Sequence, residues 1–259
     1  MSNILQIERI SHSFGGHRAV DEVSFTVEQG AITSLIGPNG AGKTTVFNLI
    51  CGILATESGD MRFRGDSIHG LAPFRVARRG IGRTFQDPRV FPEMSVLDNM
   101  MVGMRQRGES PLWALWRGER VNREWRAVRE RAEATLDAVG LLARVHDKAR
   151  DLSFGEQRFL SIARSLMASP HLVMMDEPTV GLDQAALAKL TGLMNTLVAG
   201  QGATLLVIEH NMDVVMSISK KIVLLVGGKV VASDTPEEIR KHRNMVEAYL
   251  GRKHVAAGV

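Results

Sequence analysis

The sequence contains one cysteine, Cys51, among its 259 residues. An internal disulfide is therefore excluded, and the composition suits a reducing compartment. Cys51 falls in the helical pattern that follows a glycine-rich segment, which favours a small packed residue over a nucleophile. The eight histidines show no paired spacing of the kind that metal sites use.

The sequence also lacks long apolar runs. The longest, at residues 172–175, 204–208 and 222–226, have the length of strands, whereas a membrane-spanning helix needs about 20 apolar residues. Residues 1–4 do not show the charged and then apolar layout of a signal peptide. We therefore expect a cytosolic protein, or one held at a membrane only through a partner.

Neither sign of charge is in large excess, because 32 basic and 28 acidic residues give a formal net charge of +4. Arginine is dense between Arg105 and Arg131, where eight arginines accompany four glutamates. This density is typical of a solvated helix face with i,i+4 ion pairs, and contact with anionic lipid or nucleic acid is the alternative. The length allows one large α/β domain or two small ones.

The most informative segment follows the apolar run at residues 31–36 and precedes an apolar helical pattern at 46–50. It reads Gly37, Pro38, Asn39, Gly40, Ala41, Gly42, Lys43, Thr44 and Thr45. A strand, this glycine-rich spacing and a helix together form the phosphate-binding P-loop. The glycines let backbone N–H groups approach phosphate oxygens, and the dipole of the helix favours the same anion.

Two side chains of the P-loop have expected roles. Lys43 reaches the β- and γ-phosphates, and the Thr44 hydroxyl completes the coordination of Mg²⁺. The alternative is a glycine-rich loop with a solvated lysine, but strand, spacing and helix agree against it. The P-loop alone predicts binding of a nucleoside triphosphate and does not say what the binding is for.

Two other predicted strands end in polar residues suited to phosphate chemistry. Asp176 and Glu177 follow residues 172–175, and His210 follows residues 204–208 with one residue between. Ligands of open α/β sheets collect at the carboxyl ends of strands, where an Asp can hold Mg²⁺ and a Glu can activate water. Because consecutive strand residues face opposite ways, we expect the turn at Pro178 to re-aim one carboxylate. We expect His210 to donate a hydrogen bond to a terminal phosphate, with a structural role as the alternative.

Phe14 and Gln86 are less certain from the residues alone. Phe14 precedes Gly15 and Gly16 and can stack on a nucleotide base or anchor the core, and its spacing does not decide between these roles. Gln86 ends a predicted strand that begins at Ile81 and precedes a proline-rich loop. It suits a mobile sensor or an ordinary loop.

The predicted fold class is α/β, with strands near the N-terminus and a helical block inserted between residues 95 and 142. In that block an apolar stripe at helical spacing predicts one buried helix face, formed by Trp125, Val128, Ala132, Leu136 and Val139. Trp113 and Trp116 share one helical face and are expected to pack in a core or an interface rather than to stack on a cofactor. Ser153 with Glu156 three residues later predicts a capped helix start.

These motifs resemble, in their order and separations, the nucleotide-binding subunits of ABC transporters. The segment Leu152-Ser153-Phe154-Gly155 separates this family from other P-loop proteins. The resemblance covers residues 4–251 and implies one nucleotide-binding domain, 1–259, of ABC ATPase type. It has a P-loop NTPase sheet core at 1–90 and 170–259, an antiparallel N-terminal β region, and a helical subdomain at about 91–169.

The resemblance also implies roles for single residues. Glu177 is the catalytic carboxylate, His210 the switch histidine, and Lys43 the third catalytic residue, while Thr44, Gln86 and Asp176 serve Mg²⁺. Ser153, Gly155 and Glu156 complete a site on the opposite subunit. The implied nucleotide-binding set is Phe14, Gly37, Asn39, Gly40, Ala41, Gly42, Lys43, Thr44, Thr45, Gln86, Ser153, Gly155, Glu156 and Asp183.

Within the family, residues 82–86, 152–158 and 247–251 resemble the ATP-binding subunits of branched-chain (hydrophobic) amino acid importers. That group usually has Gln at position 156 and Asn at positions 87 and 183, where this chain has Glu156, Asp87 and Asp183. Relatives of similar appearance serve urea, amides or aromatic acids, and residues 77–82 also resemble lipopolysaccharide exporters.

The implied cofactors are ATP and Mg²⁺. The implied partners are a second, identical or related ATPase subunit in a head-to-tail dimer, two permease subunits received near residues 86–94, and a periplasmic solute-binding protein, with no nucleic acid. The implied location is the cytoplasmic face of the inner membrane. A DNA-repair or translation ATPase is the rival enzyme, but it needs a further module for which we expect no room. A regulatory module that does not cleave ATP would lack the carboxylate or the histidine.

Overall fold

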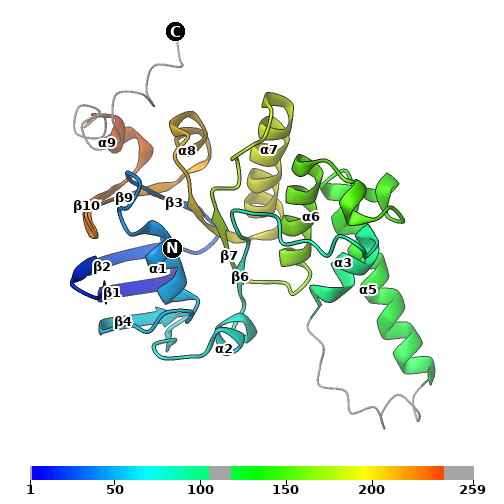
Figure 1. Ribbon diagram of the computed structural model, residues 1–259, viewed down its shortest axis with the longest axis horizontal. Coiled ribbons are helices and arrows are strands. Elements are labelled where there is room, and N and C mark those ends of the chain that lie inside the picture. The colour runs from blue at the N-terminus through cyan, green and yellow to red at the C-terminus, as the bar shows by residue number, and fades with distance from the viewer. Residues whose placement is uncertain (1, 105–117, 242–259) are drawn as a thin grey trace. The chain divides into compact units, whose positions relative to one another are not determined.

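The computed structural model describes residues 2–104 and 118–241. The chain forms two compact units. The first comprises Met1–Gln86, His171–Val180 and Leu187–Val259, and the second comprises Asp87–Pro170 and Gly181–Ala186. The sheets belong to the first unit, and the second is helical (Figure 1). That both units form one nucleotide-binding domain stays a prediction.

The first unit contains an antiparallel sheet of order β2-β1-β4-β5. Its strands are β1 (Asn3–Phe14), β2 (His17–Glu28), β4 (Ser58–Phe63) and β5 (Asp66–Ser67). The predicted antiparallel N-terminal region is therefore confirmed. The pairing of β1 with β2 continues to the turn that connects them, since His12 pairs with Val20 and Phe14 with His17. Only Gly15 and Gly16 separate them, because a two-residue turn continues the pairing through a polar stretch.

The second sheet of this unit has the order β10-β9-β3-β8-β7-β6, in which β10 is antiparallel to β9 and the other pairs are parallel. Its strands are β3 (Ile32–Ile36), β6 (Ile81–Arg83), β7 (Leu172–Asp176), β8 (Thr204–Ile208), β9 (Lys221–Val226) and β10 (Lys229–Asp234). Every residue of β3, β7 and β8 is buried, as continuous apolar runs predict for central parallel strands.

The helix α1 (Lys43–Ile50) connects the two sheets through the core. Its residues Val46, Phe47, Leu49 and Ile50 share one buried cluster with side chains of β1 and β4 and of β3, β7 and β8. Packing against both sheets fixes the start of α1, and therefore the loop that precedes it. The other helices of this part of the chain are α2 (Pro73–Arg78), α7 (Gln184–Gln201, which begins in the second unit), α8 (Met212–Ile218) and α9 (Pro236–Lys241).

Cys51 caps the C-terminal end of α1 and is buried. Its Sγ lies 3.8 Å from Sδ of Met174 on β7. Burial raises the pKa of the Cys51 thiol, and the nearby Arg83 guanidinium acts in the opposite direction. The prediction of a packed residue is confirmed.

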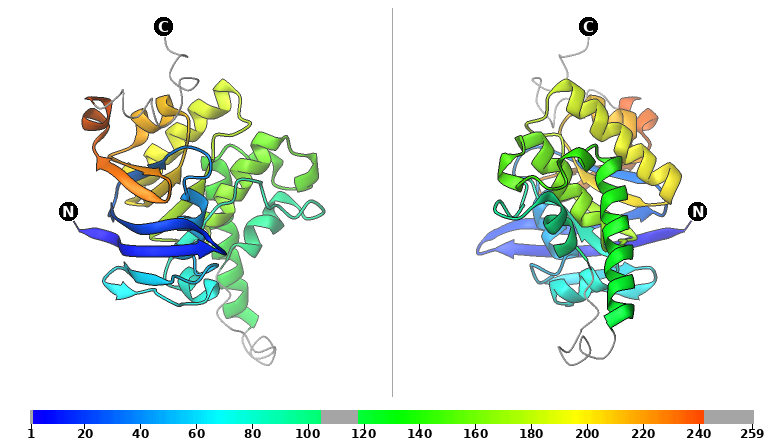
Figure 2. Two further views of the ribbon diagram at one scale, coloured as in Figure 1. Left: turned by 60° about the vertical axis from the view of Figure 1, so that its left-hand side comes forward. Right: turned by 90° about the vertical axis from the view of Figure 1, so that its right-hand side faces the viewer.

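The second unit packs three helices against one another, as Figure 2 shows for the long green helix and its neighbours. They are α3 (Val96–Val102), α5 (Gly118–Ala138) and α6 (Phe154–Leu166), with short 3-10 turns η1 (Leu142–Arg144) and η2 (Ala149–Asp151) before α6. Ser153 caps α6 in a full capping box with Glu156, as predicted. Trp113 and Trp116 lie outside the described residues. Within the described ranges, no helix has the length and apolar character that crossing a membrane requires.

The predicted apolar stripe of α5 is buried only toward its C-terminal end. Ala132, Leu136 and Val139 are at most 1% exposed, but Trp125 is 56% exposed, so its predicted burial is wrong. Helical spacing shows which residues share a face, but it does not show how far along that face the neighbouring helices reach.

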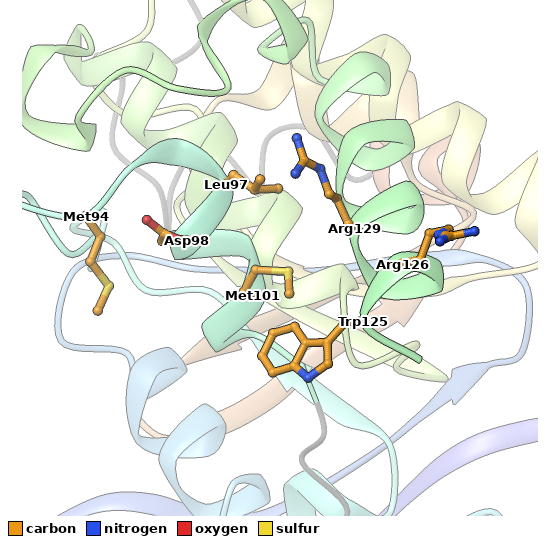
Figure 3. A pocket seen from close by; sticks show the side chains of 7 residues that line it. All are labelled: Met94, Leu97, Asp98, Met101, Trp125, Arg126 and Arg129. Carbon is orange, nitrogen blue, oxygen red and sulfur yellow. The ribbon is translucent and has the colours of Figure 1, made fainter. Parts of the chain in front are cut away.

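Trp125 instead borders a surface hollow of about 770 Å³ between α3 and α5 (Figure 3). The hollow is lined by Met94, Leu97, Asp98, Met101, Trp125, Arg126 and Arg129. Arg129 also pairs with Glu133 at 2.8 Å, one turn along the helix. This pair is of the i,i+4 kind expected for the arginine-rich stretch.

The two ends of this stripe are expected to respond differently to truncation. Leu136→Ala leaves a cavity in a packed core and should lower the free energy of unfolding by about 2–5 kcal/mol. Trp125→Ala removes an exposed side chain and should change it by no more than about 0.5 kcal/mol. Urea unfolding followed by circular dichroism measures both, and equal losses would contradict the partial burial described here.

Candidate functional site

The loop between β3 and α1 is closely packed at two of its glycines. A Cβ on Gly37 would lie 2.0 Å from the carbonyl oxygen of Leu225, and a Cβ on Gly42 would lie 2.3 Å from that of Ala19. Gly42 also has φ +96°, a conformation that other residues rarely adopt. These positions therefore require glycine, which seats the loop against β2 and β9 and presents the start of α1.

Lys43 is 7% exposed, and its ammonium is held by the loop itself. Nζ donates to the carbonyl oxygens of Gly37 at 2.7 Å and Pro38 at 3.0 Å. Burial lowers the pKa of Lys43, while the carboxylates of Glu177 and Asp176 raise it. The loop residues at 39 and 40 and the Thr44 side chain are exposed, and the first turn of α1 contains no acidic residue. Its positive dipole end is thus not neutralised by its own side chains.

Asp176 is the buried last residue of β7, and it is bound by Arg83 of β6. Nη2 of Arg83 lies 3.2 Å from Oδ2 of Asp176, and Nη1 donates to Oδ1 of Asn48 on α1 at 2.7 Å. The guanidinium also lies over the rings of Phe47 and Phe85. Burial raises the pKa of the Asp176 carboxyl, and Arg83 opposes the shift. Arg83 therefore connects two strands and α1 directly behind the P-loop.

The backbone changes direction at Glu177, the first residue after β7. Its φ is +47°, a left-handed value that is unfavourable for a residue with a side chain. Its N–H donates to the carbonyl oxygen of Ile208 at 3.0 Å. The expected turn at Pro178 is present, because the N–H of Val180 donates to the carbonyl oxygen of Glu177 at 3.3 Å, and the change of direction already begins at Glu177.

The side chain of Glu177 lies between two of the predicted site residues. Nε2 of Gln86 donates to Oε2 of Glu177 at 2.8 Å, and Nδ1 of His210 lies 4.0 Å from Oε1. Glu177 is partly exposed and His210 more so. The structure thus brings an amide, a carboxylate and an imidazole together at one edge of the parallel sheet, where ligands of such sheets bind.

Four further predicted residues, Ser153, Gly155, Glu156 and Asp183, belong to the second unit. The Ser153 hydroxyl donates to Oε2 of Glu156 at 2.9 Å and accepts from the Glu156 N–H at 3.3 Å. Arg144 holds the other oxygen of Glu156 at 3.2 Å. A Cβ on Gly155 would lie 3.5 Å from a methyl group of Leu182, an ordinary contact. Oδ1 of Asp183 accepts from the N–H of Ala186 at 2.8 Å and so caps the start of α7.

Comparison with known families agrees with this geometry. Residues 20–180 match the family model described as ABC transporter. The chain belongs to this family. The high-affinity branched-chain amino acid transport ATP-binding protein BraF of Pseudomonas aeruginosa is 39% identical over 249 residues, 96% of this chain and 98% of the relative. The corresponding LivG protein of Escherichia coli K12 is 37% identical over the same shares.

Solved structures of ABC cassettes have the same fold. A nucleotide-free ATP-binding cassette from an ABC transporter has a TM-score of 0.83 and 34% identity, covering 96% of this chain and all of that one. The ADP conformation of an ATP-binding cassette of an ABC transporter has a TM-score of 0.81 and 34% identity, covering 93% and 94%. The predicted P-loop NTPase fold of ABC ATPase type is confirmed.

Phe14 of this ABC ATPase is not a core residue. It is 51% exposed at the end of β1, and its ring meets that of His12 edge to face at 4.7 Å. The alternative of a core anchor is therefore wrong. Base stacking stays a prediction for this ring.

Sequence reasoning missed two charged residues of this ABC ATPase, of which Arg83 is largely buried and Glu209 fully buried. Arg83 lies in a predicted strand, and Glu209 directly follows β8 and is fully buried. The available signal is the same for both: a charged residue within or at the end of a strand expected to be covered on both faces needs a partner. The partner itself is not visible in the sequence.

The Arg83 and Asp176 pair gives a test of this buried edge. Arg83→Met should lower the free energy of unfolding by about 3–5 kcal/mol, because it leaves a buried carboxylate without its cation. It also raises the pKa of Asp176 further, so the folded protein binds more protons than the unfolded chain. The loss should therefore grow as pH rises above the ordinary range of an Asp carboxyl.

Unfolding by urea at several pH values measures this effect. Adding Asp176→Asn to Arg83→Met removes the unpaired charge and should recover part of the loss and its pH dependence. If the double variant is as unstable and as pH-dependent as Arg83→Met, the ion pair does not have the role described.

Proposed function

We propose that this chain is the ATP-hydrolysing subunit of a membrane importer for branched-chain or other hydrophobic amino acids. The observation that carries the hydrolytic role is the placement of Gln86, Glu177 and His210 at the sheet edge that also presents the P-loop. The amino acid substrate is supported by the near full-length similarity to BraF and LivG.

The P-loop is proposed to bind the phosphates of ATP through its backbone. The N–H groups of residues 37–45 and the start of α1 favour an anion by geometry and by field. Lys43 exchanges its bonds to the Gly37 and Pro38 carbonyls for phosphate oxygens. The Lys43 ammonium is already buried before ATP binds, so this exchange does not require it to be taken out of water.

The residues proposed to hold Mg²⁺ are Thr44, Gln86 and Asp176, whose hydroxyl, amide and carboxylate oxygens are the hard donors this ion prefers. Among the described residues no cluster of three or more His, Cys, Asp or Glu forms a metal site. This fits an ion held by one carboxylate together with substrate phosphates. The bound ion would neutralise charge on the phosphates.

Glu177 is proposed to orient the attacking water and take its proton. Gln86 fixes one carboxylate oxygen, and the other faces His210, so the carboxylate has a defined direction. His210 stabilises charge that develops on the terminal phosphate. An oriented base and a nearby donor add to the phosphate binding by the P-loop and Lys43, and together these groups supply the positioning and charge stabilisation that phosphoryl transfer to water needs.

The active assembly is proposed to be a head-to-tail dimer with an identical or related subunit. Each ATP lies between the P-loop of one subunit and Ser153, Gly155 and Glu156 of the other, with Asp183 near the same interface. Because the nucleotide contacts both subunits, its binding favours closure and its hydrolysis reopens the dimer.

Transport would be coupled through two permease subunits at the cytoplasmic face of the inner membrane, with a periplasmic solute-binding protein acting through them. We place the permease contact on the second unit, which begins at Asp87 and includes the hollow bordered by Met94 and Trp125. Both side chains are exposed and apolar, which suits a partner helix.

Replacing the proposed base separates binding from chemistry. Glu177→Gln should bind ATP as the unchanged protein does but hydrolyse it at least about 100-fold more slowly, the lower range for loss of a general base. Phosphate release measures turnover and a fluorescent ATP analogue measures binding. Unchanged phosphate release would remove Glu177 from the assigned role.

The dimer can be tested in the same slow background. Glu177→Gln protein should associate when ATP is added, because the shared nucleotide is not consumed. Adding Ser153→Ala should weaken this association about 10-fold or more, since a hydrogen bond to a charged phosphate oxygen contributes roughly 1.5–3 kcal/mol. Sedimentation velocity measures the dimer fraction, and intact association would contradict the shared site.

A further inference from the structure

Glu209 is a fully buried carboxylate that the proposed mechanism does not use. It lies between β8 and His210 and is 0% exposed. Oε1 accepts hydrogen bonds from the N–H of Thr179 at 3.0 Å and from its hydroxyl at 2.6 Å. Oε2 accepts from the N–H groups of His210 at 3.2 Å and Asn211 at 3.4 Å. Both oxygens are thus occupied by donors.

These partners explain why the residue is a glutamate. Four donors converge on two oxygens, and a carboxylate is the side chain that accepts at both ends. A glutamine would place its NH₂ group against backbone N–H groups at one end. That end would then leave buried donors unsatisfied, which costs more than the loss of one favourable bond.

The two segments that Glu209 joins are those that carry the proposed chemistry. Thr179 is two residues after Glu177, and His210 is the next residue after Glu209 itself. The N–H of Glu177 itself bonds to the carbonyl oxygen of Ile208 at the end of β8. The left-handed conformation of Glu177 is unfavourable for a residue with a side chain and persists only where its surroundings hold it. The bonds of Glu209 to Thr179 anchor the chain immediately after this turn.

We infer that Glu209 is a positioning residue for ATP hydrolysis, which holds the Glu177 turn and the His210 backbone in one fixed geometry. The bonds of Glu209 go to Thr179 and to the backbone N–H groups of His210 and Asn211, so it acts through the chain on either side of the proposed catalytic groups. This inference rests on the proposed function, because it assumes that Glu177 and His210 act on the same phosphate.

The mildest test removes one bond without changing shape. Thr179→Val deletes the hydroxyl donor to Glu209, keeps the backbone N–H donor, and is nearly isosteric. Glu209→Gln is the stronger variant. A matched control is Thr204→Val, because Thr204 is a fully buried threonine at the opposite end of β8 whose hydroxyl accepts from the N–H of Gly30 at 3.0 Å.

In steady-state ATP hydrolysis by the full chain, Glu209→Gln and Thr179→Val should lower kcat and leave KM nearly unchanged. We expect kcat to fall about 10- to 100-fold for Glu209→Gln and several-fold for Thr179→Val, the range seen when groups that orient a reactive ligand are changed. Binding of a fluorescent ATP analogue should change less than about 2-fold, because the P-loop is untouched. Thr204→Val should keep kcat within about 2-fold of the unchanged protein. Its loss of thermal stability should be similar to that of Thr179→Val, because each variant removes one buried hydroxyl.

The Glu177→Gln background distinguishes this inference from the function on which it rests. Single-turnover hydrolysis in that background should change little when Thr179→Val is added, because residues that act as a unit are not additive. Full activity of Thr179→Val and Glu209→Gln would overturn the positioning role, as would a loss of kcat no larger than that of Thr204→Val. Full activity of Glu177→Gln would instead overturn the proposed base.

Discussion

The parallel pairing of β7 with β8 ends at Asp176 and Ile208, and the arrangement of the sheet edge depends on that end point. The next amide, that of Glu177, still bonds to Ile208, but the chain there is already left-handed. Two adjacent carboxylates therefore separate: Asp176 stays buried against Arg83, and Glu177 faces Gln86. Because the neighbouring strands β3, β8, β7 and β6 all run parallel, the residues that follow them meet at this edge whatever their distance in the sequence.

Three charged side chains are buried at this edge, and each has a different kind of partner. Lys43 bonds to carbonyls of its own loop, Asp176 pairs with Arg83, and Glu209 collects four donors from two loops. Burial shifts the pKa of Lys43 down and that of Asp176 up, so desolvation favours the neutral form of both. The opposite charges nearby act against these shifts. The fold therefore offsets the cost of burying these charged groups before a phosphate binds. Groups held in place in this way can stabilise charge on a phosphate without rearranging, which is preorganised electrostatic stabilisation.

The features that could be predicted from the sequence are those set by local chemistry. The P-loop, the buried strands and the Ser153 capping box each depend on residues a few positions apart, and the strand-to-helix order gave the fold class. Three features depend on contacts over long separations and were missed or wrong. Arg83 and Asp176 are 93 residues apart, and Thr179 and Glu209 are 30 apart, so no spacing reveals either partner. Trp125 shares the period of a buried stripe, but the neighbouring helices do not cover the part of α5 on which it lies.

The start of α6 shows how the proposed interface tolerates an extra negative charge. Glu156 is the acidic residue of the first turn, and its carboxylate fixes the Ser153 hydroxyl that is expected to meet a phosphate of the other subunit. A carboxylate favours the helix N-terminus in isolation, but it would also repel an incoming phosphate. Arg144 lies 3.2 Å from the other oxygen of that carboxylate and supplies the opposite charge. The serine is thus oriented by a carboxylate whose field is reduced by a guanidinium that Asp147 also shares, which leaves the N–H groups of α6 better suited to an anion.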